Sequence, residues 1–66
     1  MNNAMGDDMM QYDDWLTIVR NAIRQRGYEP PDEIYIRGYY VDITADHNGA
    51  VDTAADIIDQ IVDGEL

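Results

Sequence analysis

Aspartate recurs at the spacing of an α-helix in the last quarter of the chain. These residues lie three or four positions apart: Asp52, Asp56, Asp59 and Asp63. Apolar residues follow the same period beside them: Val51, Ala54, Ala55, Ile58, Ile61 and Val62. The pattern predicts a helix over about 51–63, with an apolar face toward a core and a continuous acidic face toward solvent.

The whole chain is acidic. Fourteen aspartates and glutamates face four arginines, and the formal net charge is −10 in 66 residues. A surface of this sign attracts basic surfaces and repels nucleic acid and anionic membranes. Because like charges repel one another most strongly at low ionic strength, we expect added salt to stabilise the folded chain.

The length of the chain limits its stability. A chain of 66 residues forms one domain, and a domain of this size buries only about 60% of its unfolded surface. The absence of cysteine excludes disulfides and thiolate metal sites. We expect residues 1–8 to be a disordered N-terminus and residues 9–64 to form a single small domain. Oligomerisation or docking on a partner would add stability.

A first amphipathic helix is predicted over about 9–26. Its apolar residues fall on one face: Tyr12, Trp15, Leu16, Val19, Ala22 and Ile23. Asp8 followed by Gln11 resembles a capping box. Gly27 fits the position after a helix end, where a positive φ is needed.

The segment between the two helices, residues 33–44, has the sequence EIYIRGYYVDIT. Its β-branched and aromatic residues favour a strand, with Gly38 as a bulge or turn. We therefore expect an α+β domain, in which two amphipathic helices flank a short β-hairpin or strands shared with a second copy. The alternative is an all-α three-helix domain, with Pro31 in the first turn of a short helix and Asp32 and Glu33 near its positive end.

Residues 45–49, ADHNG, are predicted to form a turn. Asp46, Asn48 and Asp52 in and after this turn are candidate ligands for a divalent cation. Aligning the turn glycine with the EF-hand template puts threonine at the first ligand position and alanine at the last. Since both of those ligands are missing, the sequence predicts no specific metal site.

The chain offers little for catalysis. Thr44, His47 and Asp52 form a hydroxyl, imidazole and carboxylate set, but no glycine-rich oxyanion loop accompanies it. We therefore expect a protein that is not an enzyme and uses no cofactor.

Three arginines form a small basic cluster in this otherwise acidic chain. Arg20, Arg24 and Arg26 lie near Trp15 and Tyr28, and arginines beside aromatic rings can stack on bases. The net charge opposes nucleic-acid binding. We expect these arginines to pair with the chain's own carboxylates, and we expect no direct contact with nucleic acid.

The acidic face suggests a partner instead. Carboxylates four residues apart rise about 6 Å along a helix, close to the roughly 6.8 Å of two base-pair steps along DNA. The predicted function is a protein-binding module that mimics nucleic-acid charge, with Asp52, Asp56, Asp59 and Asp63 meeting a basic groove. Tyr39 or Tyr40 is the predicted apolar anchor.

In size and charge the chain resembles small acidic proteins of phages and mobile elements that block restriction, CRISPR or repair enzymes. That resemblance implies an inhibitor of a defence or DNA-processing enzyme. The second hypothesis is a small accessory or structural subunit, homodimeric, whose acidic surface reflects adaptation to salt.

The expected location is the cytoplasm, or the host cytoplasm if a phage encodes the chain. The N-terminus lacks the basic start and apolar run of a secretory signal. No stretch approaches the length of an apolar membrane span. We therefore expect no membrane binding.

Overall fold

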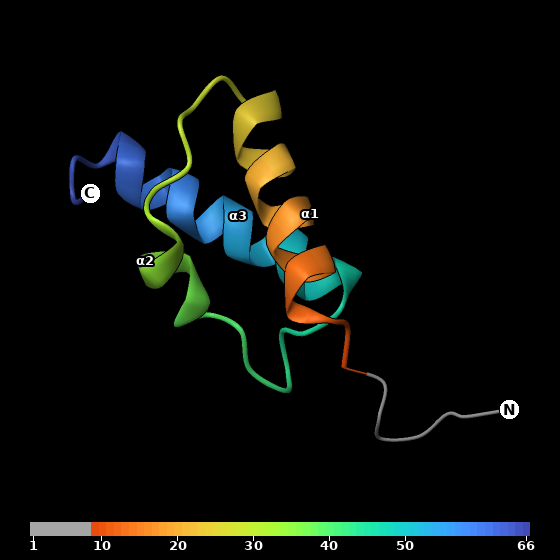
Figure 1. Ribbon diagram of the computed structural model, residues 1–66. Helices are drawn as coiled ribbons and strands as arrows, with labels where there is room; N and C mark the ends of the chain where they lie inside the picture. Colours follow the sequence, from red (N-terminus) through yellow and green to blue (C-terminus); the bar gives the residue numbers. More distant parts are fainter. Residues whose placement is uncertain (1–8) are drawn as a thin grey trace, which may run out of the picture.

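The computed structural model describes residues 9–66, and the segment predicted to be a disordered N-terminus, residues 1–8, lies outside them. The described chain forms three helices, namely α1 (Tyr12–Gln25), α2 (Glu33–Arg37) and α3 (His47–Val62). In Figure 1, α1 crosses α3 at a steep angle, and the short α2 lies to one side of the crossing. Within residues 9–66 no helix is long and apolar enough to cross a bilayer.

The predicted α+β fold is wrong, and the all-α alternative describes the chain. Residues 33–44 form no strand; the first five are α2 and the rest are turns. The Asp32 carboxylate caps α2 by accepting a hydrogen bond from the Ile34 backbone N–H at 3.2 Å. The side chain of Ile36 is fully buried in the core. The apolar residues of this segment therefore reflect packing of a short helix and its turns, not strand pairing.

The first predicted helix is confirmed, with tighter bounds than 9–26. Trp15, Leu16, Val19 and Ile23 form its buried face. The capping box does not form as predicted, because Gln11 is itself the N-cap residue and its side chain makes no capping bond; Asp8 lies outside the described residues. Gly27 follows the helix with φ 87°, as the sequence predicts.

The final helix starts earlier than predicted, because residues 47–49 belong to its first turn and not to a preceding loop. The Asp46 carboxylate is the N-cap and accepts from the Gly49 backbone N–H at 2.6 Å. A Cβ atom on Gly49 would overlap the backbone carbonyl of Thr44. Glycine at this position therefore allows a close backbone approach rather than forming a turn.

The buried face of α3 is rotated from the predicted apolar face. The buried residues of α3 are Gly49, Ala50, Thr53, Ala54, Ile57 and Ile58. Val51, Ala55 and Val62 were predicted to be buried but are exposed. Ile61 is half-buried, and Gly64 follows the helix with φ 80°.

A junction of backbone and aromatic contacts joins the two long helices at one end. The indole Nε1 of Trp15 donates to the Thr44 carbonyl at 2.7 Å, and the Met10 N–H donates to the Ala45 carbonyl at 2.8 Å. The Tyr40 hydroxyl donates to the Met10 carbonyl, and its ring meets the Trp15 ring edge-on at 5.1 Å between centroids. The turn before α3 is thereby fixed to the start of α1.

Replacing Gly49 with alanine tests the close approach at this junction. We expect Gly49→Ala to lower the free energy of unfolding by about 1–3 kcal/mol or more, because the new Cβ forces Thr44 or α3 to move. Urea denaturation followed by the fluorescence of Trp15 measures the change.

Gly38→Ala is the matched control. Gly38 has φ −61°, and an added Cβ there would lie 3.5 Å from the Tyr35 carbonyl oxygen, an ordinary van der Waals contact. We expect this variant to be neutral or more stable by about 0.4–1 kcal/mol. Equal stability of the two variants would contradict the close approach at Gly49.

Candidate functional site

The four aspartates of the final helix form an exposed ridge. We call Asp52, Asp56, Asp59 and Asp63 the aspartate ridge; all four are exposed, and Asp63 is the C-cap of α3. The ridge spans about 16 Å along the helix axis, and it lies about 150° around the helix from the buried face. The core contacts of α3 therefore turn the ridge toward solvent.

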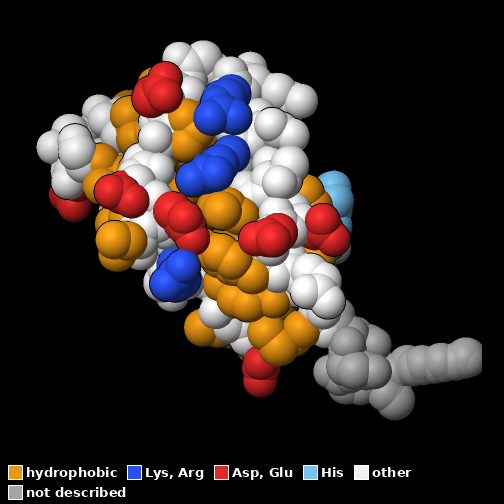
Figure 2. Space-filling view, viewed as in Figure 1, with side chains coloured by type: hydrophobic (Ala, Val, Ile, Leu, Met, Phe, Trp, Pro, Cys, Tyr) orange, Lys and Arg blue, Asp and Glu red, His pale blue; other side chains and the backbone are white. Residues whose placement is uncertain are grey.

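The ridge makes no ion pair within the described chain. Among residues 9–66 there is a single ion pair, between the Arg37 guanidinium and the Glu33 carboxylate at 2.9 Å. The expectation that the arginines of α1 pair with the chain's own carboxylates is therefore wrong for this part of the molecule. Figure 2 shows basic side chains gathered over the C-terminal half of α1. The four ridge carboxylates keep their charge available to another molecule.

An open groove lies beside the ridge, where the second half of α1 faces α3. Its volume is about 340 Å³. The lining residues are Ala22, Gln25, Arg26, Val51, Ala54, Ala55 and Ile58. Val51 is 43% exposed, and Val62 on the same side of α3 is 62% exposed. The sequence pattern missed this groove, because it assigned Val51 and Ala55 to the core.

The two predicted tyrosine anchors are engaged within the molecule. Tyr39 and Tyr40 are both half-buried and pack against the core. The Tyr39 hydroxyl accepts a hydrogen bond from Gln60 Nε2 at 2.7 Å, while the Tyr40 hydroxyl donates to the Met10 carbonyl. A partner can reach only the exposed parts of these rings, and their role in binding stays a prediction.

Gln60 links α3 to the tyrosines of α2 and the turn after it. The Tyr35 hydroxyl donates to the Gln60 side-chain oxygen, and the Tyr35 and Tyr39 hydroxyl oxygens lie 3.5 Å apart. The hydrogen bond with Tyr39, followed by partial burial, raises the pKa of Tyr35 above its ordinary value. Tyr35 therefore stays a neutral donor to Gln60 at physiological pH, and the network holds α3 at one rotation about its axis.

Arg37 is the arginine that forms an ion pair within residues 9–66. Its guanidinium contacts Glu33 and also lies 5.5 Å from the centroid of the Tyr12 ring. The Tyr12 hydroxyl, and then the Glu33 carboxylate, raise the pKa of Arg37. Tyr12 in turn donates to Glu33 at 3.1 Å. These three side chains tie α2 to the first turn of α1.

The predicted cation ligands are separated by the helix. The Asp46 carboxylate caps α3 by accepting from the Gly49 N–H. Asp52 lies about 120° away from Asp46 around the helix axis. Within residues 9–66 no three histidine, cysteine, aspartate or glutamate side chains come together as a metal site. Thr44 and His47 are likewise not joined: the Thr44 hydroxyl donates to the Tyr39 carbonyl, and His47 is exposed in the first turn of α3.

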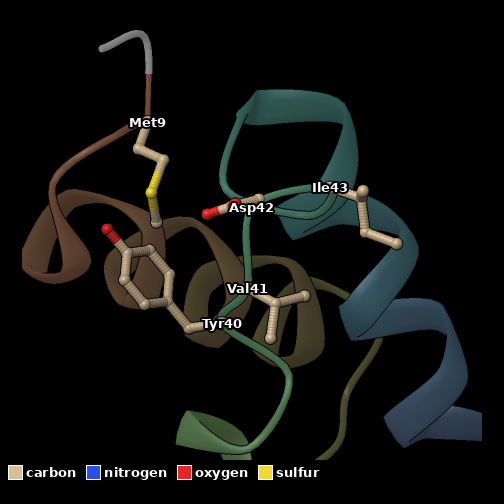
Figure 3. A pocket seen from close by; sticks show the side chains of 5 residues that line it. All are labelled: Met9, Tyr40, Val41, Asp42 and Ile43. Carbon is tan, nitrogen blue, oxygen red and sulfur yellow. The ribbon is translucent and has the colours of Figure 1, made fainter. Parts of the chain in front are cut away.

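A second, shallow depression of about 540 Å³ lies at the opposite end of the molecule from the α1 C-terminus. It is lined by Met9 and by the turn residues Tyr40–Ile43. In Figure 3 the side chains of Met9 and Tyr40 lie close together and the Asp42 carboxylate points toward them, whereas Ile43 points away. Ile43 is 86% exposed.

Comparison with protein-family models, with curated proteins and with solved structures finds no match for this chain. The site is therefore interpreted from its own geometry and charge.

Removing one ridge charge tests whether the carboxylates are unpaired. Asp63 lies at the negative end of the α3 dipole and one turn from Asp59. We expect Asp63→Asn to raise the free energy of unfolding by about 0.3–1 kcal/mol at low salt. The substitution removes the repulsion between Asp63 and the helix dipole and the repulsion between Asp63 and Asp59. The gain should shrink as salt is added. Thermal unfolding by circular dichroism measures it.

Glu33→Gln is the control, because it also removes one negative charge but breaks the ion pair with Arg37. We expect this variant to lose about 0.2–1 kcal/mol. A loss of similar size in Asp63→Asn would show that the ridge is paired.

Proposed function

We propose that the chain is a non-enzymatic, acidic protein-binding module that docks its aspartate ridge on a basic surface of another protein. The observation that supports this most is the exposure of all four ridge carboxylates without an ion pair to any arginine of residues 9–66. Carboxylates that are already paired give little to a partner, whereas unpaired ones contribute their full attraction to the encounter.

The geometry of the ridge favours a groove that normally holds nucleic acid. The carboxylates follow one side of a single helix, and successive ones rise about 4.5–6 Å. A basic groove that binds DNA is built for negative charges at about 6.8 Å per two base-pair steps along a strand. The concrete form of the proposal is an inhibitor that occupies such a groove in a defence or DNA-processing enzyme, without contacting nucleic acid itself.

Charge alone would give fast but weak association. Exposed ion pairs contribute only about 0–1 kcal/mol each, so the ridge sets the choice of partner and its orientation more than the affinity. The apolar contact must come from side chains next to the ridge. Val51 and Val62 are exposed there. Tyr39 is half-buried on the other side, where Gln60 donates to its hydroxyl.

The test is competition with nucleic acid. The chain is immobilised through its N-terminus, a lysate of the source cells is applied at low salt, and the column is eluted with duplex DNA. We expect proteins that bind DNA to be released by the duplex. The double variant Asp56→Lys, Asp59→Lys should retain none of them, because it reverses the charge in the middle of the ridge.

A matched control separates the ridge from the net charge. Glu29→Lys, Asp42→Lys changes two exposed residues away from α3. Each double variant replaces two negative charges by two positive ones, so both go from −10 to −6. The control should retain the DNA-eluted proteins. Retention by the ridge variant, or equal loss by both variants, would contradict the proposal; circular dichroism checks that both remain folded.

A second candidate is a homodimeric accessory subunit with a salt-adapted surface. The shared-strand form of this dimer is excluded by the helical structure of residues 33–37 and the turns after them. What favours a dimer is the exposure of large apolar side chains, with Ile34 at 77% and Ile43 at 86%. Sedimentation equilibrium at low and high salt tests it: this candidate requires a dimer that strengthens with salt, and a monomer under both conditions would exclude it.

A further inference from the structure

Two parallel rows of side chains run along α3. Each ridge aspartate is directly preceded by an apolar residue, giving Val51–Asp52, Ala55–Asp56, Ile58–Asp59 and Val62–Asp63. We call Val51, Ala55, Ile58 and Val62 the apolar row. Consecutive residues lie about 100° apart around a helix, so the apolar row and the ridge lie side by side over the same length.

The apolar row continues into the groove between α1 and α3. Three of its members, Val51, Ala55 and Ile58, line that groove together with Ala22 of α1. Ile58 forms its floor, since it is 6% exposed, whereas Val51 is 43% and Val62 62% exposed. The surface therefore offers a hollow with an apolar floor, and the aspartate ridge runs along α3 beside it.

The opposite edge of the groove carries a positive charge. Gln25 and Arg26, at the end of α1, line it there. Arg26 makes no ion pair with any carboxylate of residues 9–66. Across the groove, the surface thus changes from negative through apolar to positive, and this order constrains what can bind.

We propose that this groove binds an amphipathic basic helix of the partner protein. The bound helix would present an apolar row to the groove, with lysines or arginines on the edge facing the ridge. This inference rests on the proposed function and specifies the partner's contact element. A helix is the natural complement, because its i, i+4, i+7 and i+11 positions have the same spacing as the rows of α3. The apolar side chains of the bound helix then pack into the groove between α1 and α3.

Charge selects this occupant over a second copy of the chain. A second copy would bring a further charge of −10 and its own aspartate ridge toward the same face, which is repulsive at low salt. The α3 helix of a second copy has aspartate where the partner helix needs a cation. A basic helix removes the repulsion and covers the exposed members of the apolar row in one contact.

The experiment uses two synthetic peptides of about 16 residues, long enough to follow the ridge. The patterned peptide has leucine at positions i, i+4, i+7 and i+11, arginine directly after each leucine, and alanine and glutamine elsewhere. The scrambled peptide has the same composition but scatters the leucines around the helix. Both carry a fluorescent label, and binding to the full chain is measured by anisotropy at low salt. We expect the patterned peptide to bind about tenfold more tightly or better.

Two variants alter the groove without touching the core. Ala55→Trp fills it from an exposed position, and Val51→Thr keeps the side-chain shape but removes apolar character. Both should lower the affinity for the patterned peptide to that for the scrambled one. Val41→Thr is the matched control, because Val41 is 46% exposed, close to the 43% of Val51, and lies outside the groove. It should leave the affinity unchanged.

The outcomes separate the groove from the ridge. If both peptides bind equally and only Asp56→Lys, Asp59→Lys abolishes binding, the groove proposal is wrong while the ridge proposal stands. If neither peptide binds, both are wrong. If the chain alone dimerises in sedimentation and Ala55→Trp dissociates the dimer, the occupant is a second copy and the basic helix is excluded.

Discussion

The hydrogen bond from the Trp15 indole to the Thr44 carbonyl fixes the relation between the two long helices. Trp15 is fully buried, and a buried indole N–H needs an acceptor. Thr44 supplies it at 2.7 Å, and the same backbone segment lies so close to α3 that only glycine fits at position 49. Asp46 then caps the helix two residues later. The start and direction of α3 follow from this arrangement.

The functional surface depends on that placement. Once the first turn of α3 is fixed, Ile57 and Ile58 enter the core and the aspartates face outward. Gln60 adds a second constraint, because its side chain lies between the hydroxyls of Tyr35 and Tyr39. A rotation of α3 by one residue would bury a carboxylate and break this network. The fold thus holds in place an acidic ridge that has no ion pair within residues 9–66, although the aspartates repel one another along α3.

Three sets of charged side chains in the described chain have separate roles. Glu33 and Arg37 pair with each other and with Tyr12, so that they fasten α2 to α1. Asp32 and Asp46 cap helices. The ridge aspartates do neither, although a domain this small has little stability to spare. Charged side chains that form no ion pair or helix cap within residues 9–66 are the best candidates for contact with a partner protein.

The correct and the wrong predictions from the sequence both have clear physical causes. The first helix was predicted because a strong 3.6-residue period acts locally and needs no partner. Residues 33–44 were misread because isoleucine, valine and tyrosine favour strands only when a neighbouring strand is present, and here Ile36 and Tyr40 pack on helices instead. The start of α3 was predicted too late because Asn48–Gly49 is a common turn pair. In this chain Gly49 instead allows the Thr44 backbone to approach α3 closely, a contact that residue spacing does not reveal.

The sequence by itself determined the acidic ridge, the long helices and the absence of thiol chemistry, because charge, short-range periodicity and composition are properties of neighbouring residues. Only the tertiary structure decided that α3 turns Val51 and Ala55 outward and leaves Arg26 across a groove from the aspartates. Those features depend on which side of one helix meets another. That choice is made by long-range contacts, above all those of Trp15 and Gln60, which no local pattern contains.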